Sequence, residues 1–114
     1  MTFKDVAELI DEIGYPSSYY QFPDNTAEEP PFICFFYEGN NDVVADNTNY
    51  QKIERLILEL YTNYKDFEAE AIVENALNDA GLVYSREESH IDSEKLFMVI
   101  YSADVVITRE EESE

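Results

Sequence analysis

A long strand followed at once by an amphipathic helix, over residues 50–81, constrains the fold more than any other stretch of this sequence. Within residues 53–61 one strand face is wholly apolar and the other is mixed, as expected of a half-buried strand. The apolar face carries Leu56, Leu58 and Leu60. Apolar residues then recur at helical spacing from Ala69 to Ala80 and form one stripe. The stretch therefore predicts a helix that covers the apolar face of the sheet.

Capping residues mark both ends of this predicted helix. Asp66 suits the N-cap, where a carboxylate accepts hydrogen bonds from the unpaired amides of the first turn. Gly81 suits the position after the helix, in the left-handed region, and Leu82 can then close over Leu77 as in a Schellman motif. Glu70 lies near the positive end of the helix dipole and on or near the side opposite the apolar stripe.

The N-terminal stretch predicts a second, shorter helix. Thr2 can cap it, Asp5 is placed for the return contact of a capping box, and Gly14 ends it. Its apolar stripe comprises Phe3, Val6, Ala7, Ile10 and Ile13. A short strand at 19–22 follows, and we expect it at a sheet edge because prolines flank it.

Three more segments have strand patterns. Residues 32–38 are apolar on both faces, so this strand is either central or covered on its second face by another subunit. After the central helix, a strand runs from residue 82 to 87 and a polar turn from 88 to 93. The last strand runs from 95 to 107, with a bulge expected at 102–104. If the two strands that flank the central helix are parallel neighbours, the crossover should be right-handed.

The resulting fold class is α+β, in the order α-β-β-β-α-β-β. We expect a single mixed, mostly antiparallel sheet with two helices packed on one face. The other face would be half polar, which favours association. With 114 residues, one domain is expected, over residues 1–107, followed by an acidic disordered C-terminal tail over residues 108–114.

Charge restricts the partners of this chain. There are 26 acidic and 7 basic residues, for a formal net charge of -19. Such a surface repels phosphate, so direct binding to nucleic acid and binding to anionic membranes are both disfavoured. No apolar run approaches membrane-spanning length, no signal peptide is recognisable, and a soluble intracellular protein is expected. The single cysteine, Cys34, excludes an internal disulfide and is expected to be buried and reduced.

No catalytic arrangement is recognisable in the sequence. His90, the single histidine, lies in the predicted polar turn, where we expect it to be solvated. Cys34 has no adjacent base, and the three glycines do not form a phosphate-binding loop. We therefore expect a protein that is not an enzyme and that has no metal or other cofactor.

The long connection at 39–49 is the candidate contact site for a neighbouring subunit or another partner, because long loops in small domains are often functional. Its candidate residues are Asn40, Asn41, Asp42, Val43, Val44, Asp46 and Asn47. The loop lacks the alternating acids, central glycine and terminal glutamate of an EF-hand, which leaves only a weak possibility of calcium binding.

Several short runs, in this order along the chain, carry a resemblance to a known family. They are PFICF at 31–35, YQKI at 50–53, LELYT at 58–62, KD at 65–66, ALNDAG at 76–81 and EKLFMVIY at 94–101. The pattern resembles small proteins of tailed phages and prophages of Gram-positive bacteria, namely tail terminators or tail-completion (tail-to-head joining) proteins. The similarity covers residues 31 to about 107, with a weaker match at the first helix.

The resemblance implies a structural protein of virion assembly that forms an oligomeric ring, typically a hexamer. The ring would cap the phage tail tube, stop its polymerisation and offer a surface to the head connector. Its partners would be other copies of itself, the tail tube protein and the head connector protein. Its location would be the virion, and the host cytoplasm during assembly. An acidic surface that lines a channel would let DNA pass without adhering.

Two other classes of function also fit the charge. One is a DNA-mimic inhibitor of a phage, whose carboxylates imitate phosphates and occupy a basic enzyme. The other is a small acidic adaptor protein that stays monomeric. The ring hypothesis differs from both in requiring self-association.

Overall fold

The computed structural model describes residues 1–21, 29–40, 43–45, 48–93 and 95–108, with side chains for all of these except 40, 43–45 and 48–51. The elements along the chain are α1 (Phe3–Ile13), β1 (Ser17–Tyr19), β2 (Phe32–Asn40), β3 (Val43–Ala45), β4 (Thr48–Thr62), α2 (Phe67–Asp79), β5 (Tyr84–Ile91) and β6 (Leu96–Ile107). The α+β class and the predicted order of elements are confirmed. The three-residue β3 is an additional strand inside the predicted loop.

The strands lie side by side in the order β1-β2-β4-β6-β5. β1 is parallel to β2 and every other pairing is antiparallel, so the sheet is mixed and mostly antiparallel, as predicted. β6 lies between β4 and β5. The strands that flank α2, β4 and β5, are therefore not neighbours in the sheet. The condition under which we expected a right-handed crossover between adjacent parallel strands is not met. The largely polar β5 takes the edge position, where charged side chains protect an unpaired backbone, and the apolar β6 takes the interior.

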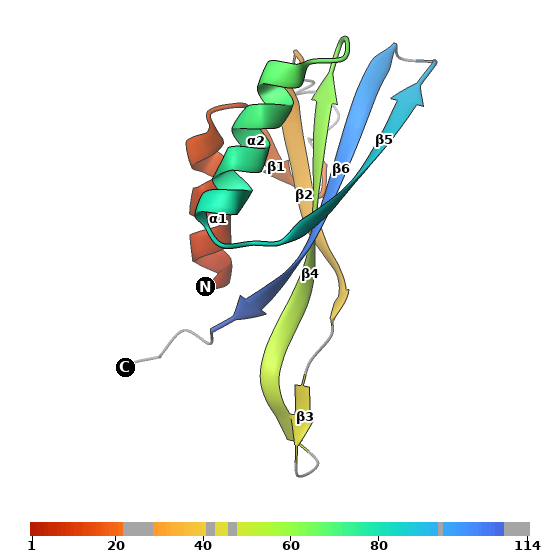
Figure 1. Ribbon diagram of the computed structural model, residues 1–114. Coiled ribbons are helices and arrows are strands. Elements are labelled where there is room, and N and C mark those ends of the chain that lie inside the picture. The colour runs from red at the N-terminus through yellow and green to blue at the C-terminus, as the bar shows by residue number, and fades with distance from the viewer. Residues whose placement is uncertain (22–28, 41–42, 46–47, 94, 109–114) are drawn as a thin grey trace.

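β4 is the longest element, with 15 residues. It pairs with β2 on one side, and on the other with β6 along residues 52–62. Its first residues continue past the sheet and pair with β3, so the β3–β4 hairpin projects from the end of the molecule (Figure 1). The protein is accordingly elongated, with extents of 50 × 27 × 25 Å.

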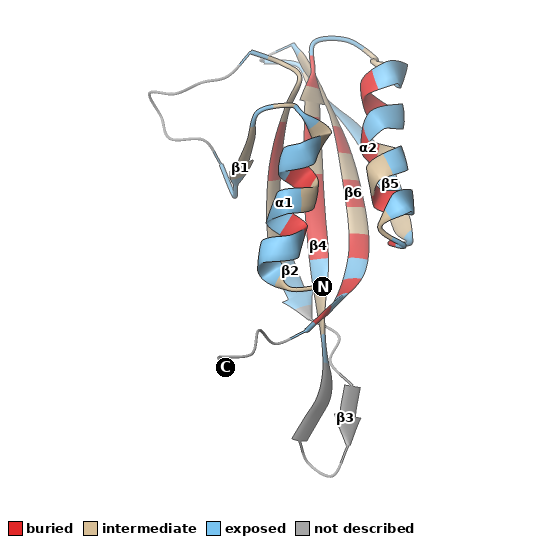
Figure 2. Ribbon diagram, turned by 90° about the vertical axis from the view of Figure 1, so that its left-hand side faces the viewer, coloured by how far each residue is buried: buried red, intermediate tan, exposed pale blue. Residues whose placement is uncertain are grey.

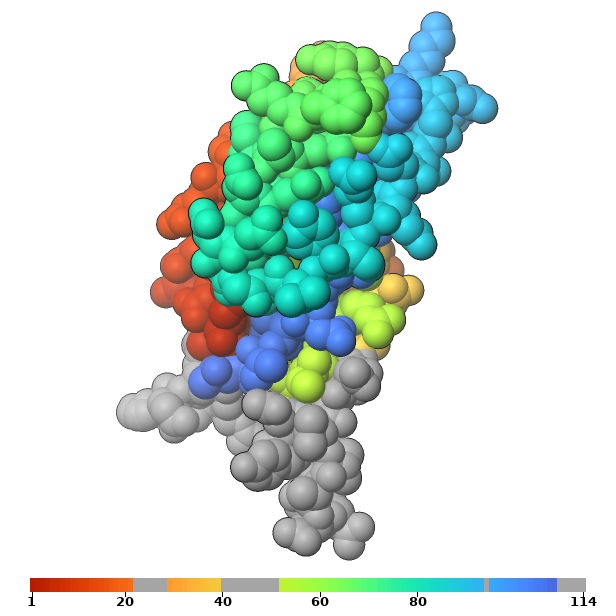
Figure 3. Space-filling model, in the orientation of Figure 1, coloured from red at the N-terminus to blue at the C-terminus, as the bar shows by residue number. Residues whose placement is uncertain are grey.

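Both helices lie on the same face of the sheet, as predicted (Figures 1 and 2). Between them and the sheet is the core, in which the three leucines of β4 are joined by residues of α1, α2, β2 and β6. Its largest fully buried side chains include Tyr101, Ile10, Ile33, Leu56, Leu58, Leu60 and Leu77. Figure 3 shows α2 lying over this side of the molecule. In the described part of the chain, no helix has the length and apolar character needed to cross a membrane.

The predicted cap of α1 is present in full. The Thr2 hydroxyl oxygen accepts from the Asp5 amide at 3.0 Å, and the Thr2 amide donates to the Asp5 carboxylate at 2.9 Å. Gly14 follows the helix in the left-handed region, with φ of 102°. Of the predicted stripe, Val6 and Ile10 are buried.

The predicted caps of α2 are also confirmed. Asp66 accepts a hydrogen bond of 3.0 Å from the Ala69 amide. At the other end, the Leu82 amide donates to the Leu77 carbonyl and the Gly81 amide to the Asn78 carbonyl, both at 3.0 Å. This is the double hydrogen bond of a Schellman motif.

Several strands differ from the prediction in their boundaries or in the position of a bulge. β5 begins at Tyr84 and continues to Ile91, through residues expected to form a turn, because pairing with β6 satisfies its backbone whatever its side chains are. β6 pairs without a bulge at 102–104. The register shift is instead in β2, between Tyr37 and Asn40, where Gly39 has φ of 71°. β1 is an edge strand as expected, but at 17–19, and residue 22 of the predicted strand lies outside the described residues.

Met1 is held beside the end of β6. The amide of Thr108 donates to the Met1 carbonyl at 2.6 Å, and the amino group of Met1 donates to the Val106 carbonyl at 3.3 Å. Thr108, which we had placed in the acidic tail, is thus held against the domain. Residues 109–114 of that tail lie outside the described residues.

Candidate interaction surface

The face of the sheet opposite the helices, here called the open face, is rich in apolar side chains. Alternate residues of each strand point to it, and cross-strand pairing arranges them in rows. One row joins Phe32, Tyr61 and Met98, and the next joins Cys34, Glu59 and Ile100. A third row contains Phe36, Ile57 and Ser102. No helix of the described chain covers this face (Figure 1).

The apolar side chains of the open face are half-buried by one another. The rings of Phe32 and Tyr61 stack with centroids 4.8 Å apart and planes 15° apart. Phe36 stacks on Tyr20 at 5.3 Å. Ile57 and Cys34 are buried beneath this layer, so the expected burial of the Cys34 thiol is confirmed. A contiguous, partly exposed apolar band of this kind is typical of a protein interaction site.

Glu59 places one carboxylate in the middle of the apolar band. Its Oε1 accepts a hydrogen bond of 2.8 Å from the Tyr61 hydroxyl. The neighbours across the sheet are Cys34 and Ile100. Since a carboxylate has more lone pairs than one hydroxyl satisfies, Glu59 retains the capacity to accept a further hydrogen bond from a partner.

Charge is distributed unevenly between the two sides of the molecule. On the open face, Arg55 and Asp104 form an ion pair at 3.5 Å, and Glu59 and Glu87 add two carboxylates. Exposed acids instead follow the outer surface of the helices, namely Asp5, Glu8, Asp11, Glu12, Glu68 and Asp79. The open face is therefore the side on which two copies of so acidic a chain can approach with the least repulsion.

The predicted contact loop is partly a hairpin rather than an irregular loop. Asn40 ends β2 and pairs with Glu54. Val43 and Val44 lie in β3 and pair with Gln51 and Asn49 of β4. The β-branched valines find a partner because β4 extends beyond the sheet, which its sequence pattern did not reveal. The other candidate positions, Asn41, Asp42, Asp46 and Asn47, lie outside the described residues.

His90 lies on β5 and not in a turn. Its ring lies 4.7 Å from that of Phe97, and its Nδ1 is 2.5 Å from Asp92 Oδ1. Within the described residues there is no group of three or more His, Cys, Asp or Glu side chains placed to hold a metal ion.

A network of charged side chains joins α2 to β5 and β6, and the sequence analysis missed it. Glu70 was placed on or near the side opposite the apolar stripe, but it is buried and pairs with Lys65 at 2.8 Å and Arg86 at 3.1 Å. Glu74 binds Arg86 at 3.1 Å and accepts from the Tyr101 hydroxyl at 2.9 Å. Helical spacing did not identify Glu70 because its partners come from the preceding loop and from a strand 16 residues away.

Protonation in this network follows from the contacts. Partial burial disfavours the charged form of Lys65, but its hydrogen bonds to Glu70 and Glu88 outweigh that effect and raise its pKa. The hydrogen bond from Lys65 lowers the pKa of the Glu88 carboxyl. Both groups are therefore charged at neutral pH, and their ion pair joins the loop before α2 to β5.

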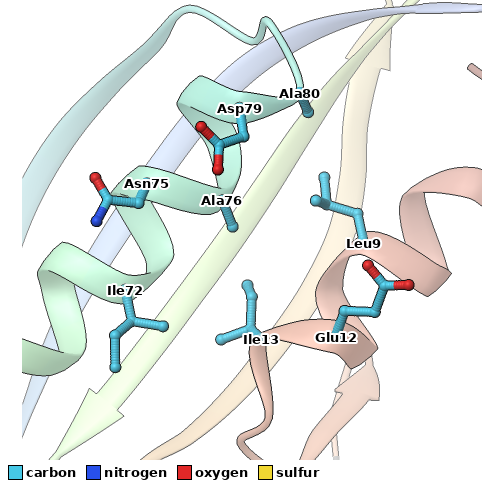
Figure 4. A pocket seen from close by; sticks show the side chains of 8 residues that line it. All are labelled: Leu9, Glu12, Ile13, Ile72, Asn75, Ala76, Asp79 and Ala80. Atoms are coloured by element: carbon cyan, nitrogen blue, oxygen red, sulfur yellow. The ribbon is translucent and has the colours of Figure 1, made fainter.

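A groove of about 470 Å³ separates the outer surfaces of α1 and α2. Leu9 and Ile13 of α1 face Ile72 and Ala76 of α2 across it, with Glu12 among the acidic side chains at its rim (Figure 4). The predicted apolar stripes of the two helices are consequently buried only on their sheet side, and Ile72 stays exposed.

Comparison with known proteins does not assign the chain to a family. The sequence matches no family model, and no curated protein is significantly similar to it.

Proposed function

We propose that this chain is a tail terminator, or tail-completion, subunit of a tailed phage or prophage, and that it assembles into a ring through its open face. The observation that carries the proposal is the apolar band on a sheet face with no helix over it among the described elements. A ring interface takes such a band out of water, and burial of half-exposed aromatic and aliphatic side chains stabilises association.

The projecting β3–β4 hairpin supports the same proposal. It extends past the edge of the sheet on the long β4 (Figure 1). A short subunit that must contact both its ring neighbour and the end of a tube benefits from such an extension. The resemblance in the sequence implies this class of assembly, and the acidic surface suits a channel through which DNA passes.

Mass in solution tests self-association. We expect light scattering to give a ring-sized multiple of the 13.2 kDa subunit. The fraction of subunits in the oligomer should increase with protein concentration. It should also increase with salt, because acidic subunits repel one another until their charges are screened. A mass of one subunit at all salt and protein concentrations, both alone and with tail tubes present, would contradict the proposal.

A pair of matched variants assigns the interface. Ile100→Glu introduces a charge into the apolar band, whereas Val83→Glu introduces the same charge at a position that is 87 % exposed and precedes β5. Ile100→Glu should dissociate the oligomer and Val83→Glu should not. In a reaction where tail tube protein polymerises, the unchanged protein and Val83→Glu should stop elongation. Ile100→Glu should let it continue.

The exposed acids on the helices favour a second candidate, the DNA-mimic inhibitor. These carboxylates are exposed on α1 and α2, and both helices cover the face of the sheet opposite the open face (Figure 2). If the protein stays monomeric and does not stop tube elongation, this candidate predicts that it competes with DNA for a basic nuclease or repressor.

A further inference from the structure

An open cleft of about 540 Å³ lies beside the N-terminal half of α1, on the helix side of the sheet. Its lining draws on α1, β1, β2 and β4, and it is almost wholly apolar. The residues that line it are Phe3, Ala7, Tyr19, Phe35, Tyr37 and Glu54. We call it the aromatic cleft, because four of its six lining residues carry aromatic rings.

The rings stand at different angles and so form walls rather than a single stack. Phe3 meets Tyr37 at 5.1 Å with planes 77° apart, and Tyr19 meets Phe35 at 5.4 Å with planes 84° apart. Tyr19 and Tyr37 lie 6.2 Å apart with a tilt of 38°. Phe3 is 45 % exposed and Tyr19 is 54 % exposed. Aromatic surface is therefore presented to solvent, and the faces of aromatic rings carry negative electrostatic potential.

The cleft contains one ion pair, and it belongs to a strongly acidic chain. Glu54 supplies a carboxylate to the lining, and Lys52 pairs with it at 2.9 Å from a half-exposed position. Burial, Tyr19 and Glu54 together raise the pKa of Tyr37 to about 12, so ionisation of its phenol is disfavoured there. The chain as a whole carries -19. An anionic ligand is repelled by this field, whereas a cation is attracted both by the field and by the ring faces.

We propose that the aromatic cleft binds the guanidinium group of an arginine side chain presented by a basic partner protein. Guanidinium is planar and weakly hydrated, so it stacks on aromatic rings while its N–H groups reach a carboxylate. Glu54 is the acceptor in this arrangement. Its pair with Lys52 is no obstacle, because a partly exposed ion pair is weak and its carboxylate can accept from two donors.

Blocked Gly-Arg-Gly and Gly-citrulline-Gly peptides provide the primary test. Citrulline has nearly the shape of arginine but no charge. In an NMR titration, the arginine peptide should cause saturable shifts in the aromatic signals of the cleft. Its affinity should exceed that of the citrulline peptide roughly 2- to 30-fold, as expected for cation–π binding. Equal affinities, or arginine shifts spread over the acidic helix surfaces, would overturn the proposal.

Paired variants separate binding in the cleft from general attraction to an acidic protein. Glu54→Gln and Glu87→Gln change the net charge equally. Glu87 lies on the open face, opposite Ile100 of β6, and therefore on the other side of the sheet from the cleft. Only Glu54→Gln should weaken binding. Tyr19→Leu should weaken it as well, whereas Tyr64→Leu, at another exposed tyrosine, should not. Equal effects within either pair would contradict the assignment.

Lys52→Gln should act in the opposite direction. Without the competing Lys52 ammonium group, the Glu54 carboxylate is available to the guanidinium of the ligand. The arginine peptide should then bind several-fold more tightly. Unchanged backbone spectra of each variant will show that the fold is retained. The cleft and the open face lie on opposite sides of the sheet, so failure of this test would leave ring assembly untouched, and the reverse also holds.

Discussion

Arg86 on β5 donates a hydrogen bond of 3.1 Å to Glu70 on α2, and through it the charged edge strand is tied to the helix above. Glu70 is 3 % exposed, and Lys65 binds the same carboxylate from the loop before the helix. One buried anion thus organises two cations, and both of these cations keep some contact with water.

Glu70→Gln should therefore lower the free energy of unfolding substantially. The change leaves Lys65 and Arg86 close together without their shared anion. A cost of about 2–3 kcal/mol is expected, below the cost of breaking a fully buried pair, because both cations are partly solvated. Denaturant unfolding measures the effect. Glu8→Gln, which removes an exposed charge from α1, should change stability by no more than about 0.5 kcal/mol.

Two tyrosine hydroxyls should respond oppositely to removal. The Tyr37 hydroxyl is buried and has no hydrogen-bond partner among the described residues, whereas that of Tyr101 donates to Glu74. Tyr37→Phe should stabilise the protein by about 1 kcal/mol, and Tyr101→Phe should destabilise it by about 1.5 kcal/mol. Thermal or chemical unfolding of both variants decides the matter, and a loss of stability in Tyr37→Phe would reveal an unrecognised hydrogen bond.

The same tyrosine gives a prediction at high pH. Because burial raises the pKa of Tyr37 from 10.0 to about 12, the folded protein holds this proton more tightly than the unfolded chain does. This group leaves the free energy of unfolding unchanged below pH 10.0, and it lowers that free energy as the pH rises toward 12, because the unfolded chain loses the proton first. Ultraviolet titration should show a late tyrosine ionisation in the unchanged protein that Tyr37→Phe lacks.

At acid pH the relevant group is Glu88. Its hydrogen bond from Lys65 lowers its pKa below the ordinary value of 4.5. The stabilisation that this contact provides is therefore present above pH 4.5 and disappears as the pH falls through the lowered value. The difference in stability between the unchanged protein and Glu88→Gln should be greatest near neutrality and vanish in acid. A difference that persists in acid would show that the charge of Glu88 is not responsible.

Gly81→Ala tests the C-terminal cap of α2. Gly81 has φ of 78°, and a Cβ added there meets no atom within 4 Å, so the penalty arises from the backbone alone. It should be about 1 kcal/mol, and Gly81→Asn should cost less because asparagine tolerates the left-handed region. Equal costs for the two variants would point to a steric cause instead.

Local signals in the sequence predicted the local features well. Thr2, Asp66 and Gly81 act within a few residues of themselves, so their caps could be read directly. The extent of β5 and the burial of Glu70 could not be predicted from the sequence, because each depends on a partner that only the fold brings close. The aromatic cleft was missed for the same reason, since its rings come from three separate elements.

The open face was predicted only in outline. The mixed alternation of β4 and the two apolar faces of β2 indicated a second surface in need of a partner. Which residues lie next to Glu59 depends on strand order, and the interior position of β6 was not predicted. In the candidate loop, the hairpin went unrecognised because Val43 and Val44 form a strand only with the extended start of β4 beside them.

β4 also has a mechanical consequence. It is one unbroken strand from the projecting hairpin to the loop before α2, and it is hydrogen-bonded to neighbours on both sides. Antiparallel hydrogen bonds run perpendicular to the strands, so a pull along β4 loads them in shear, all together rather than one after another. Tension applied at the hairpin is therefore shared by the hydrogen bonds on both sides of β4, and many of them must break together before the strand can be pulled out.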